Sequence, residues 1–181
     1  MVSSVVEKNL SDWKFLGHSV HSLSIIPEGH KNKTDEEKGP AILLIHGFGA
    51  STTHWRHNLP VLGKQYEVHA LDLLGFGKSS KPSGLAYGGP LWKDQIVAYV
   101  KEKIGRPTIL VGNSLGGYAA LASGAALGQE AAGVVLLNAA GYFSEDKKTT
   151  KGTWATARKT VAGIFLKNAL LQRIIFENLR Q

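Results

Sequence analysis

A chain of 181 residues with 43% hydrophobic and 19% charged side chains is long enough to bury a sizeable core as one globular unit. It has no cysteine, which excludes a disulfide framework and a thiolate metal site, and no apolar run approaches the length of a membrane span. The formal charge is +7, but residues 144–181 hold eight Lys/Arg against three Asp/Glu, so the basic character belongs to one segment. We therefore expect a cytoplasmic protein that binds no nucleic acid.

The first third of the chain predicts strands joined by polar loops. Residues 13–26 alternate apolar and polar side chains, which favours two antiparallel strands with a bend near Gly17. The charged segment 29–39 predicts a solvated loop. The continuous apolar run Ala41–Ile45 predicts a buried strand, as required by a parallel sheet that is covered on both faces.

Helices and strands alternate in the middle of the chain. A helix is predicted over residues 53–62, with Ser51 or Thr52 as its cap. Val68–Asp72 predicts the next strand. Apolar residues spaced by four over 92–104 predict one face of a further helix. This order of elements is typical of an α/β sheet.

The segment Gly112-Asn113-Ser114-Leu115-Gly116 follows the apolar run Ile109–Val111 and precedes a stretch of small residues that reaches Leu127. A buried strand that ends on Gly-x-Ser-x-Gly and turns into a helix is the pattern of a nucleophile elbow, which lifts the serine oxygen above the sheet. The pentapeptide alone is a weak signal in a chain with 21 glycines. The strand before it and the helix after it make Ser114 the predicted nucleophile.

A last buried strand, Val134–Leu137, completes the predicted mostly parallel sheet with helices on both faces. Sites in such sheets gather at the carboxyl ends of the strands. Four polar residues follow predicted strands directly: His46, Asp72, Ser114 and Asn138.

A serine hydroxyl attacks an acyl carbon only when a base accepts its proton and donors stabilise the oxyanion. The N–H of Leu115 is one predicted donor, because Leu115 opens the helix after the serine. The N–H of Phe48, in the glycine-rich turn of the neighbouring strand, is the other. The residues predicted to support this site are His46, Gly47, Gly112 and Gly116.

The base and the acid are harder to assign. Elbow hydrolases carry serine, then Asp or Glu, then His along the chain, but no histidine follows Ser114 in this sequence. His46 and His54 are the upstream candidates, and His46 is better explained as a hydrogen-bonding residue of the oxyanion turn. Asp72 is better explained as a residue that orders its own loop.

Two nucleotide-binding patterns fit poorly. Gly77-Lys78-Ser79 resembles a phosphate loop, but the first glycine of that motif would fall at Asp72. Gly47-x-Gly49 with Asp72 resembles a dinucleotide site, but its third glycine position is Thr52. Neither pattern explains the elbow, so no cofactor and no metal are expected.

Residues 153–180 predict one or two helices whose apolar face is wider than a surface helix needs. Core packing explains this face, and so does a lid that supplies an apolar wall over the serine. Because the segment is also basic, it suits peripheral contact with a lipid surface.

Several segments together resemble the α/β-hydrolase superfamily, over about residues 13–143. The segments that carry the resemblance are Leu44–Ser51, Ala70–Ser79 and Val111–Tyr118. Within this region Trp92–Gln95, the elbow and Leu136–Ala139 look like the pheophytinase and chlorophyll-dephytylase branch of photosynthetic organisms.

The resemblance implies an incomplete α/β-hydrolase fold, with residues 1–143 as the N-terminal part of the core and 144–181 as the start of a helical cap. It implies a serine hydrolase of the esterase type, acting on an apolar carboxylic ester such as a phytyl ester, through Ser114, Phe48 and Leu115. The triad acid and histidine would come from a C-terminal half outside this sequence, and the branch would place the protein in a plastid. The alternative is a non-catalytic α/β-hydrolase-like scaffold or binding protein.

Overall fold

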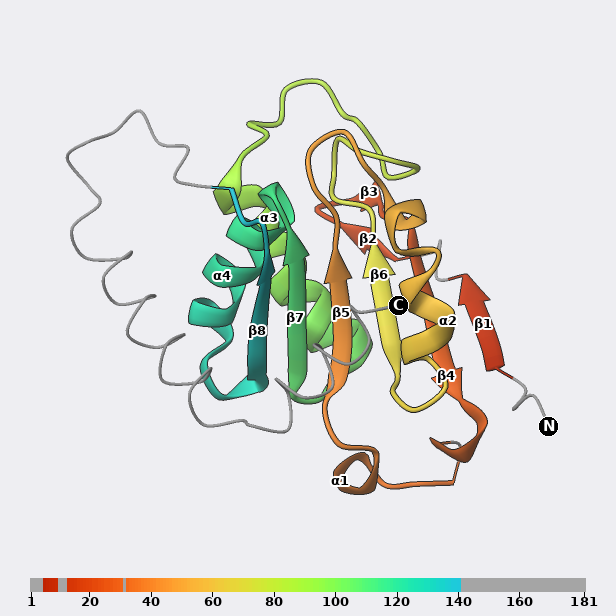
Figure 1. Cartoon of the computed structure of the whole chain (residues 1–181). Coiled ribbons are helices and arrows are strands. Elements are labelled where there is room, and N and C mark those ends of the chain that lie inside the picture. Colours follow the sequence, from red (N-terminus) through yellow and green to blue (C-terminus); the bar gives the residue numbers. More distant parts are fainter. Residues whose placement is uncertain (1–4, 10–12, 31, 141–181) are drawn as a thin grey trace.

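The computed structural model describes residues 5–9, 13–30 and 32–140, which form a six-stranded sheet with helices on both faces (Figure 1). The strand order is β1-β4-β6-β5-β7-β8. The strands are β1 (Val5–Asn9), β4 (Ser22–Pro27), β5 (Ala41–Ile45), β6 (Val68–Leu71), β7 (Thr108–Asn113) and β8 (Ala131–Leu137). Strands β6, β5, β7 and β8 are parallel, whereas β1 and β4 are antiparallel to their neighbours. The predicted mostly parallel α/β sheet is therefore confirmed.

The helices cover the two faces of this sheet. One face carries the 3₁₀ turn η2 (Thr52–Trp55) and α2 (Asn58–Leu62), and the other carries α3 (Gly89–Tyr99) and α4 (Leu115–Leu127) (Figure 1). A π-helical turn (Val100–Ile104) extends α3 and ends at Gly105 in the left-handed conformation. The smaller elements are η1 (Glu28–His30), α1 (Asp35–Lys38) and η4 (Gly128–Glu130).

Strand β5 shows why a continuous apolar run marks the centre of such a sheet. Its side chains alternate between the faces, so Leu43 and Ile45 pack in the core under α3 and α4. Ile42 and Leu44 pack in the second core, under η2 and α2. All five residues of β5 are buried, and the burial of both faces is what a strand between two helical layers requires.

The N-terminal region differs from its prediction. Residues 13–26 contain three strands rather than two. The pair β2 (Lys14–Phe15) and β3 (His18–Ser19) turns at Leu16 and Gly17, both at positive φ, so the bend near Gly17 is confirmed. The third strand, β4, joins the main sheet beside β6, and β1, which the sequence did not predict, pairs with β4.

Two further predictions are corrected. The charged loop 29–39 contains α1, which begins with a capping box: the Thr34 side chain accepts from the Glu37 amide, and the Glu37 side chain accepts from the Thr34 amide. These bonds satisfy amides that a loop would leave to water. The helix predicted over 53–62 is two short helices, η2 and α2, and Ser51 is the cap of the first.

The predicted cap, residues 144–181, lies outside the residues that the structure describes, and so do its apolar face, its lid role and its lipid contact. Among the described helices none is both long enough and apolar enough to cross a membrane.

Candidate active site

Ser114 lies between β7 and α4 in a backbone conformation that L-residues rarely adopt, with φ 51° and ψ −116°. Such a conformation is strained and persists only where the surrounding structure fixes it. Here the Ser114 N–H donates to the carbonyl of Leu137 at 3.0 Å, and the Ser114 carbonyl accepts from the amides of Gly117, Tyr118 and Ala140 at 2.8–3.3 Å. The backbone of the predicted nucleophile is therefore held from both sides, while its side chain is only partly buried.

Two glycines allow the turn to form. A Cβ on Gly112 would collide with the carbonyl of Gly116, and a Cβ on Gly116 would collide with the carbonyls of Ile45 and His46. Strand β7, helix α4 and the end of β5 therefore approach backbone to backbone. The backbone contact explains why glycine stands at both positions, which the sequence predicted to support the site.

The loop after β5 lies beside the serine. A Cβ on Gly47 would stand 3.2 Å from the Cβ of Ser114, so this loop is close enough to border the Ser114 side chain. Within the described part of the chain, the amides of Phe48 and Leu115 have no hydrogen-bond acceptor. Unpaired donors at the start of a helix and beside a nucleophile are the components of an oxyanion hole.

His46 is fully buried and has a structural role in this turn. Its Nε2 accepts from the amide of Leu73 at 3.1 Å, so its Nδ1 carries the proton and donates to the carbonyl of Gly47 at 2.8 Å. Burial lowers the pKa of His46, against the opposing effects of the Gly47 carbonyl and the charge of Asp72. With both ring nitrogens engaged, His46 joins the β5 loop to the β6 loop and has no lone pair for the serine.

Asp72 is also fully buried, and it fixes the same two loops. Its Oδ1 accepts from the amide of Thr52 at 2.6 Å and its Oδ2 from the amide of Lys78 at 2.7 Å. Its backbone carbonyl accepts from the hydroxyl of Ser79 and the side chain of Gln95. Both carboxylate oxygens are thus used within the fold, which agrees with a loop-ordering role and leaves none for a ribose.

The base for Ser114 is not found among the described residues. No histidine there hydrogen-bonds Ser114. His54 is exposed on η2 with its ring against Trp55, at 4.8 Å between centroids. His69 is engaged by Tyr99 and Glu67. The roles predicted for Ser114, Phe48 and Leu115 remain predictions.

The sequence missed a group of aromatic residues beside this turn. Phe76 from the β6–α3 loop packs against both His46 and Phe48, with centroids 5.7 and 5.4 Å apart, and Trp92 from α3 packs against Phe76 at 5.7 Å. The sequence placed Trp92 on a helix face and Phe76 in a loop without periodicity, and both in segments that carry the family resemblance, but it predicted no contact between them. The described residues include no group of three His, Cys, Asp or Glu placed to hold a metal ion.

A serine at a strained strand-to-helix turn, at the carboxyl edge of a mostly parallel sheet, defines the class of proteins with a nucleophile elbow. Residues 42–176 match the model of the family described as "Alpha/beta hydrolase family". The chain belongs to this family.

Two curated relatives illustrate the similarity. The chain is 33% identical to "Pheophytinase, chloroplastic" of Arabidopsis thaliana over 150 residues, which cover 65% of this chain and 31% of the relative. It is 35% identical to "2-hydroxymuconate semialdehyde hydrolase" of Pseudomonas sp. (strain CF600) over 113 residues, which cover 61% of this chain and 40% of the relative. The chain thus spans well under half the length of these relatives. The two names differ, so the similarity supports the family and does not identify one substrate.

A solved structure shows the same fold. A membrane phospholipase A, described as a bacterial virulence factor, superimposes with a TM-score of 0.65 at 29% identity, over 81% of this chain and 43% of that chain. The predicted α/β-hydrolase fold is confirmed, as is the resemblance to pheophytinase.

Proposed function

We propose that this protein is a serine hydrolase of the esterase type, in which Ser114 attacks the carbonyl carbon of an apolar carboxylic ester. The amides of Phe48 and Leu115 stabilise the oxyanion that forms. The observation that carries the proposal is the strained Ser114 backbone, fixed by four backbone hydrogen bonds beside two amides without an acceptor in the described structure.

The reaction proceeds through an acyl-enzyme. The Ser114 oxygen forms a bond to the acyl carbon, a base takes the serine proton, and the C–O bond to the alcohol breaks as the alkoxide receives that proton. Water then cleaves the acyl-enzyme by the same route and frees the acid. Each tetrahedral intermediate places its negative oxygen between the two amides.

The base and the acid are proposed to come from polypeptide outside this sequence, because no histidine follows Ser114 in it. Removing the histidine of a working triad lowers turnover on the order of a millionfold. We therefore expect the 181-residue chain alone to react slowly at Ser114. Imidazole in the buffer can stand in for the missing base, because it is the side-chain group of histidine.

The test is labelling of the 181-residue chain with a fluorophosphonate, with and without imidazole, followed by mass spectrometry to locate the phosphonylated residue. We expect labelling at Ser114 whose rate rises with imidazole, and none in the Ser114→Ala chain. Ser19→Ala is the matched control, since Ser19 is an exposed serine on β3, and it should label as the parent does.

A chain that remains unlabelled at Ser114 even in imidazole would overturn the proposal. That result would favour the non-catalytic scaffold, which keeps the elbow without the chemistry. Labelling that persists after Ser114→Ala would overturn it as well, because the reactive group would then lie elsewhere.

A further inference from the structure

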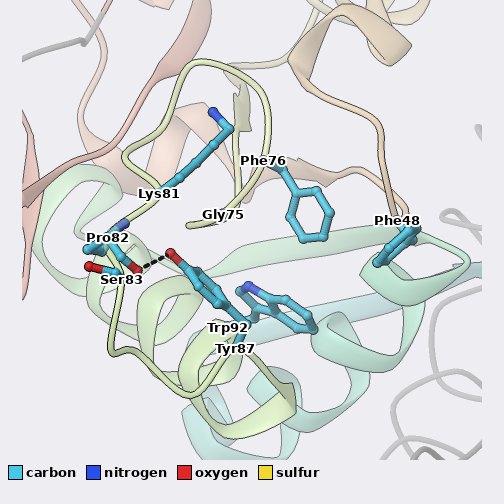
Figure 2. Close-up of a pocket in the computed structure, with 8 residues that line it drawn as sticks. All are labelled: Phe48, Gly75, Phe76, Lys81, Pro82, Ser83, Tyr87 and Trp92. Carbon is cyan, nitrogen blue, oxygen red and sulfur yellow. Dashed lines mark hydrogen bonds between the residues drawn. The ribbon is translucent and has the colours of Figure 1, made fainter.

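A pocket of about 390 Å³ opens beside Phe48, the proposed oxyanion donor. This volume lies in the range of small-molecule sites. Figure 2 shows that the pocket wall comes from the β5 loop, the β6–α3 loop and α3. The wall residues used below are Phe48, Phe76, Lys81, Pro82, Tyr87 and Trp92.

The main polar groups of the wall are already engaged by the protein. The indole N–H of Trp92 donates to the carbonyl of Leu74 at 3.0 Å, and the hydroxyl of Tyr87 donates to the carbonyl of Pro82 at 2.7 Å (Figure 2). The ammonium of Lys81 donates to two carbonyls of its own loop at 2.6 and 3.1 Å and points away from the rings. The remaining polar side chain, Ser83, is exposed. The wall therefore offers a ligand mainly apolar surface.

The rings of the wall are tilted against one another and do not form a closed stack. Phe48 meets Phe76 at an interplanar angle of 76°, and Phe76 meets Trp92 at 44°. Aromatic pairs prefer edge-to-face and offset arrangements, each contributing about 0.5–1.5 kcal/mol beyond the area that is buried. A wall of tilted rings presents both faces and edges, and a flat guest ring can form edge-to-face and offset contacts with them that an alkyl chain lacks.

Phe48 joins this pocket to the proposed reaction. Its side chain is 81% exposed, although it belongs to a loop whose backbone borders Ser114. Its amide is the proposed donor to the ester carbonyl oxygen, and its ring forms the pocket wall. An ester held by that amide therefore has one of its substituents within reach of the ring.

We infer that this pocket binds a flat, apolar ring system in one half of the ester. The substrate class is thus an ester of a ring-containing acid or alcohol, recognised without a charged or hydrogen-bonding group on the ring. This inference rests on the proposed function, because Phe48 orients the substrate only if its amide binds the carbonyl.

The test is binding of 2-naphthyl acetate to the full Ser114→Ala chain, measured by titration calorimetry so that no turnover is needed. We expect binding that is stronger than that of n-octyl acetate. Phe48→Ala, added to this chain, should weaken it about tenfold, because it removes the ring contacts and keeps the amide. Val61→Ala is the matched control: Val61 is an exposed apolar residue on α2, across the sheet from α3, and it should change nothing.

The outcomes separate the two proposals. Absence of binding, or binding that Phe48→Ala leaves unchanged, would overturn the pocket while the labelling of Ser114 still tests the nucleophile. Equal affinity for the naphthyl and octyl esters would overturn the preference for a ring. Binding as expected without labelling of Ser114 would support a pocket for a flat ring but overturn the esterase function, and with it the ester as substrate.

Discussion

The two ends of the parallel strands use their polar groups differently. At the carboxyl ends of β5 and β7, the amides of Phe48 and Leu115 have no acceptor in the described structure. At the amino ends of β6 and β7, buried charges pair with one another. In the described residues, the edge at the carboxyl ends (the carboxyl edge) thus holds amides without an acceptor, and the edge at the amino ends (the amino edge) holds paired charges.

At the amino edge, four side chains form one hydrogen-bonded network. The Arg106 guanidinium donates to Glu67 at 2.7 Å and also to the carbonyl of Gly39. His69 donates from Nε2 to the other oxygen of Glu67 at 2.8 Å, and its Nδ1 lies 3.2 Å from the hydroxyl of Tyr99. The network ties the starts of two strands to the end of α3.

The carboxyl edge also contains buried polar groups, but they support loops. His46 and Asp72 use their side-chain atoms to hold the turns that present Phe48 and Phe76. Buried polar groups are costly unless they are satisfied. The comparison therefore teaches that the buried charged groups of both edges have partners within the fold, while in the described residues the carboxyl edge also holds two backbone amides without an acceptor. Each substitution below tests the carboxyl edge or the amino edge.

The largest expected effect follows from Asp72→Ala. The buried amide of Thr52 and the part-buried amide of Lys78 lose a charged acceptor, and hydrogen bonds to charged groups contribute about 1.5–3 kcal/mol each. We expect a loss of about 4 kcal/mol in the free energy of unfolding, measured in urea, together with loss of labelling at Ser114. Asp35→Ala, which removes an exposed ion pair with Lys38, should cost less than about 1 kcal/mol. Unchanged labelling in a folded Asp72→Ala chain would show that the loop holds its shape without the carboxylate.

Gly116→Ala tests the backbone contact beneath the elbow. The new Cβ would meet the carbonyls of Ile45 and His46, which cannot move without shifting β5, so we expect a loss of about 3 kcal/mol. Gly124→Ala in the same helix is the matched control, because its Cβ would meet a methyl group of Val134 at 2.6 Å. A buried valine side chain must shift there, which costs less than moving two backbone carbonyls, and alanine gains about 1 kcal/mol of helix propensity, so we expect a smaller loss. Similar losses in both variants would show that the close approach at Gly116 has no special role.

Local patterns explain what the sequence predicted well. The apolar run of β5 and the glycine spacing around Ser114 are each set by neighbouring residues, and the structure places both as expected. Strand β1 was missed, because its five residues show no alternation and its pairing with β4 depends on contacts distant in sequence. The break between η2 and α2 was missed because the apolar positions continue through it.

The same distinction applies to the site. Ser114 and Leu115 lie in one strand-turn-helix unit, and Phe48 lies in the turn after one strand. A local sequence motif is therefore enough to predict each of them. The aromatic pocket joins Phe48 to Phe76 and Trp92, which come from three separate elements. Their meeting depends on how the loops fold over the sheet, and only the structure shows it.

Glu67→Gln tests the amino edge through its pH dependence. Burial opposes ionisation of Glu67, but His69 and Arg106 outweigh it and lower its pKa from 4.5 to about 2. Because the folded pKa is the lower one, the stabilisation is present above about pH 4.5 and is lost as the pH falls towards 2. We expect the parent to exceed the variant by about 2 kcal/mol at pH 7, with the difference narrowing across that window in urea unfolding. A difference that stays constant from pH 7 to pH 3 would contradict the assigned pairing.

Tyr99→Phe tests the last link of that network and should have the smallest effect. The ring remains packed against Trp13, and only the hydroxyl near His69 is lost, so we expect a cost of about 1 kcal/mol and unchanged labelling of Ser114. Burial raises the pKa of Tyr99 to about 12, and the nearby charge of Glu67 acts in the same direction. Folded stability should therefore fall as the pH rises from about 10 to 12, and an ultraviolet titration of the Tyr99→Phe chain should lack the tyrosine ionisation near pH 12. If Tyr99→Phe instead changed labelling at the opposite edge, the two ends of the strands would be coupled, and the separation between a binding edge and a self-paired edge would be wrong.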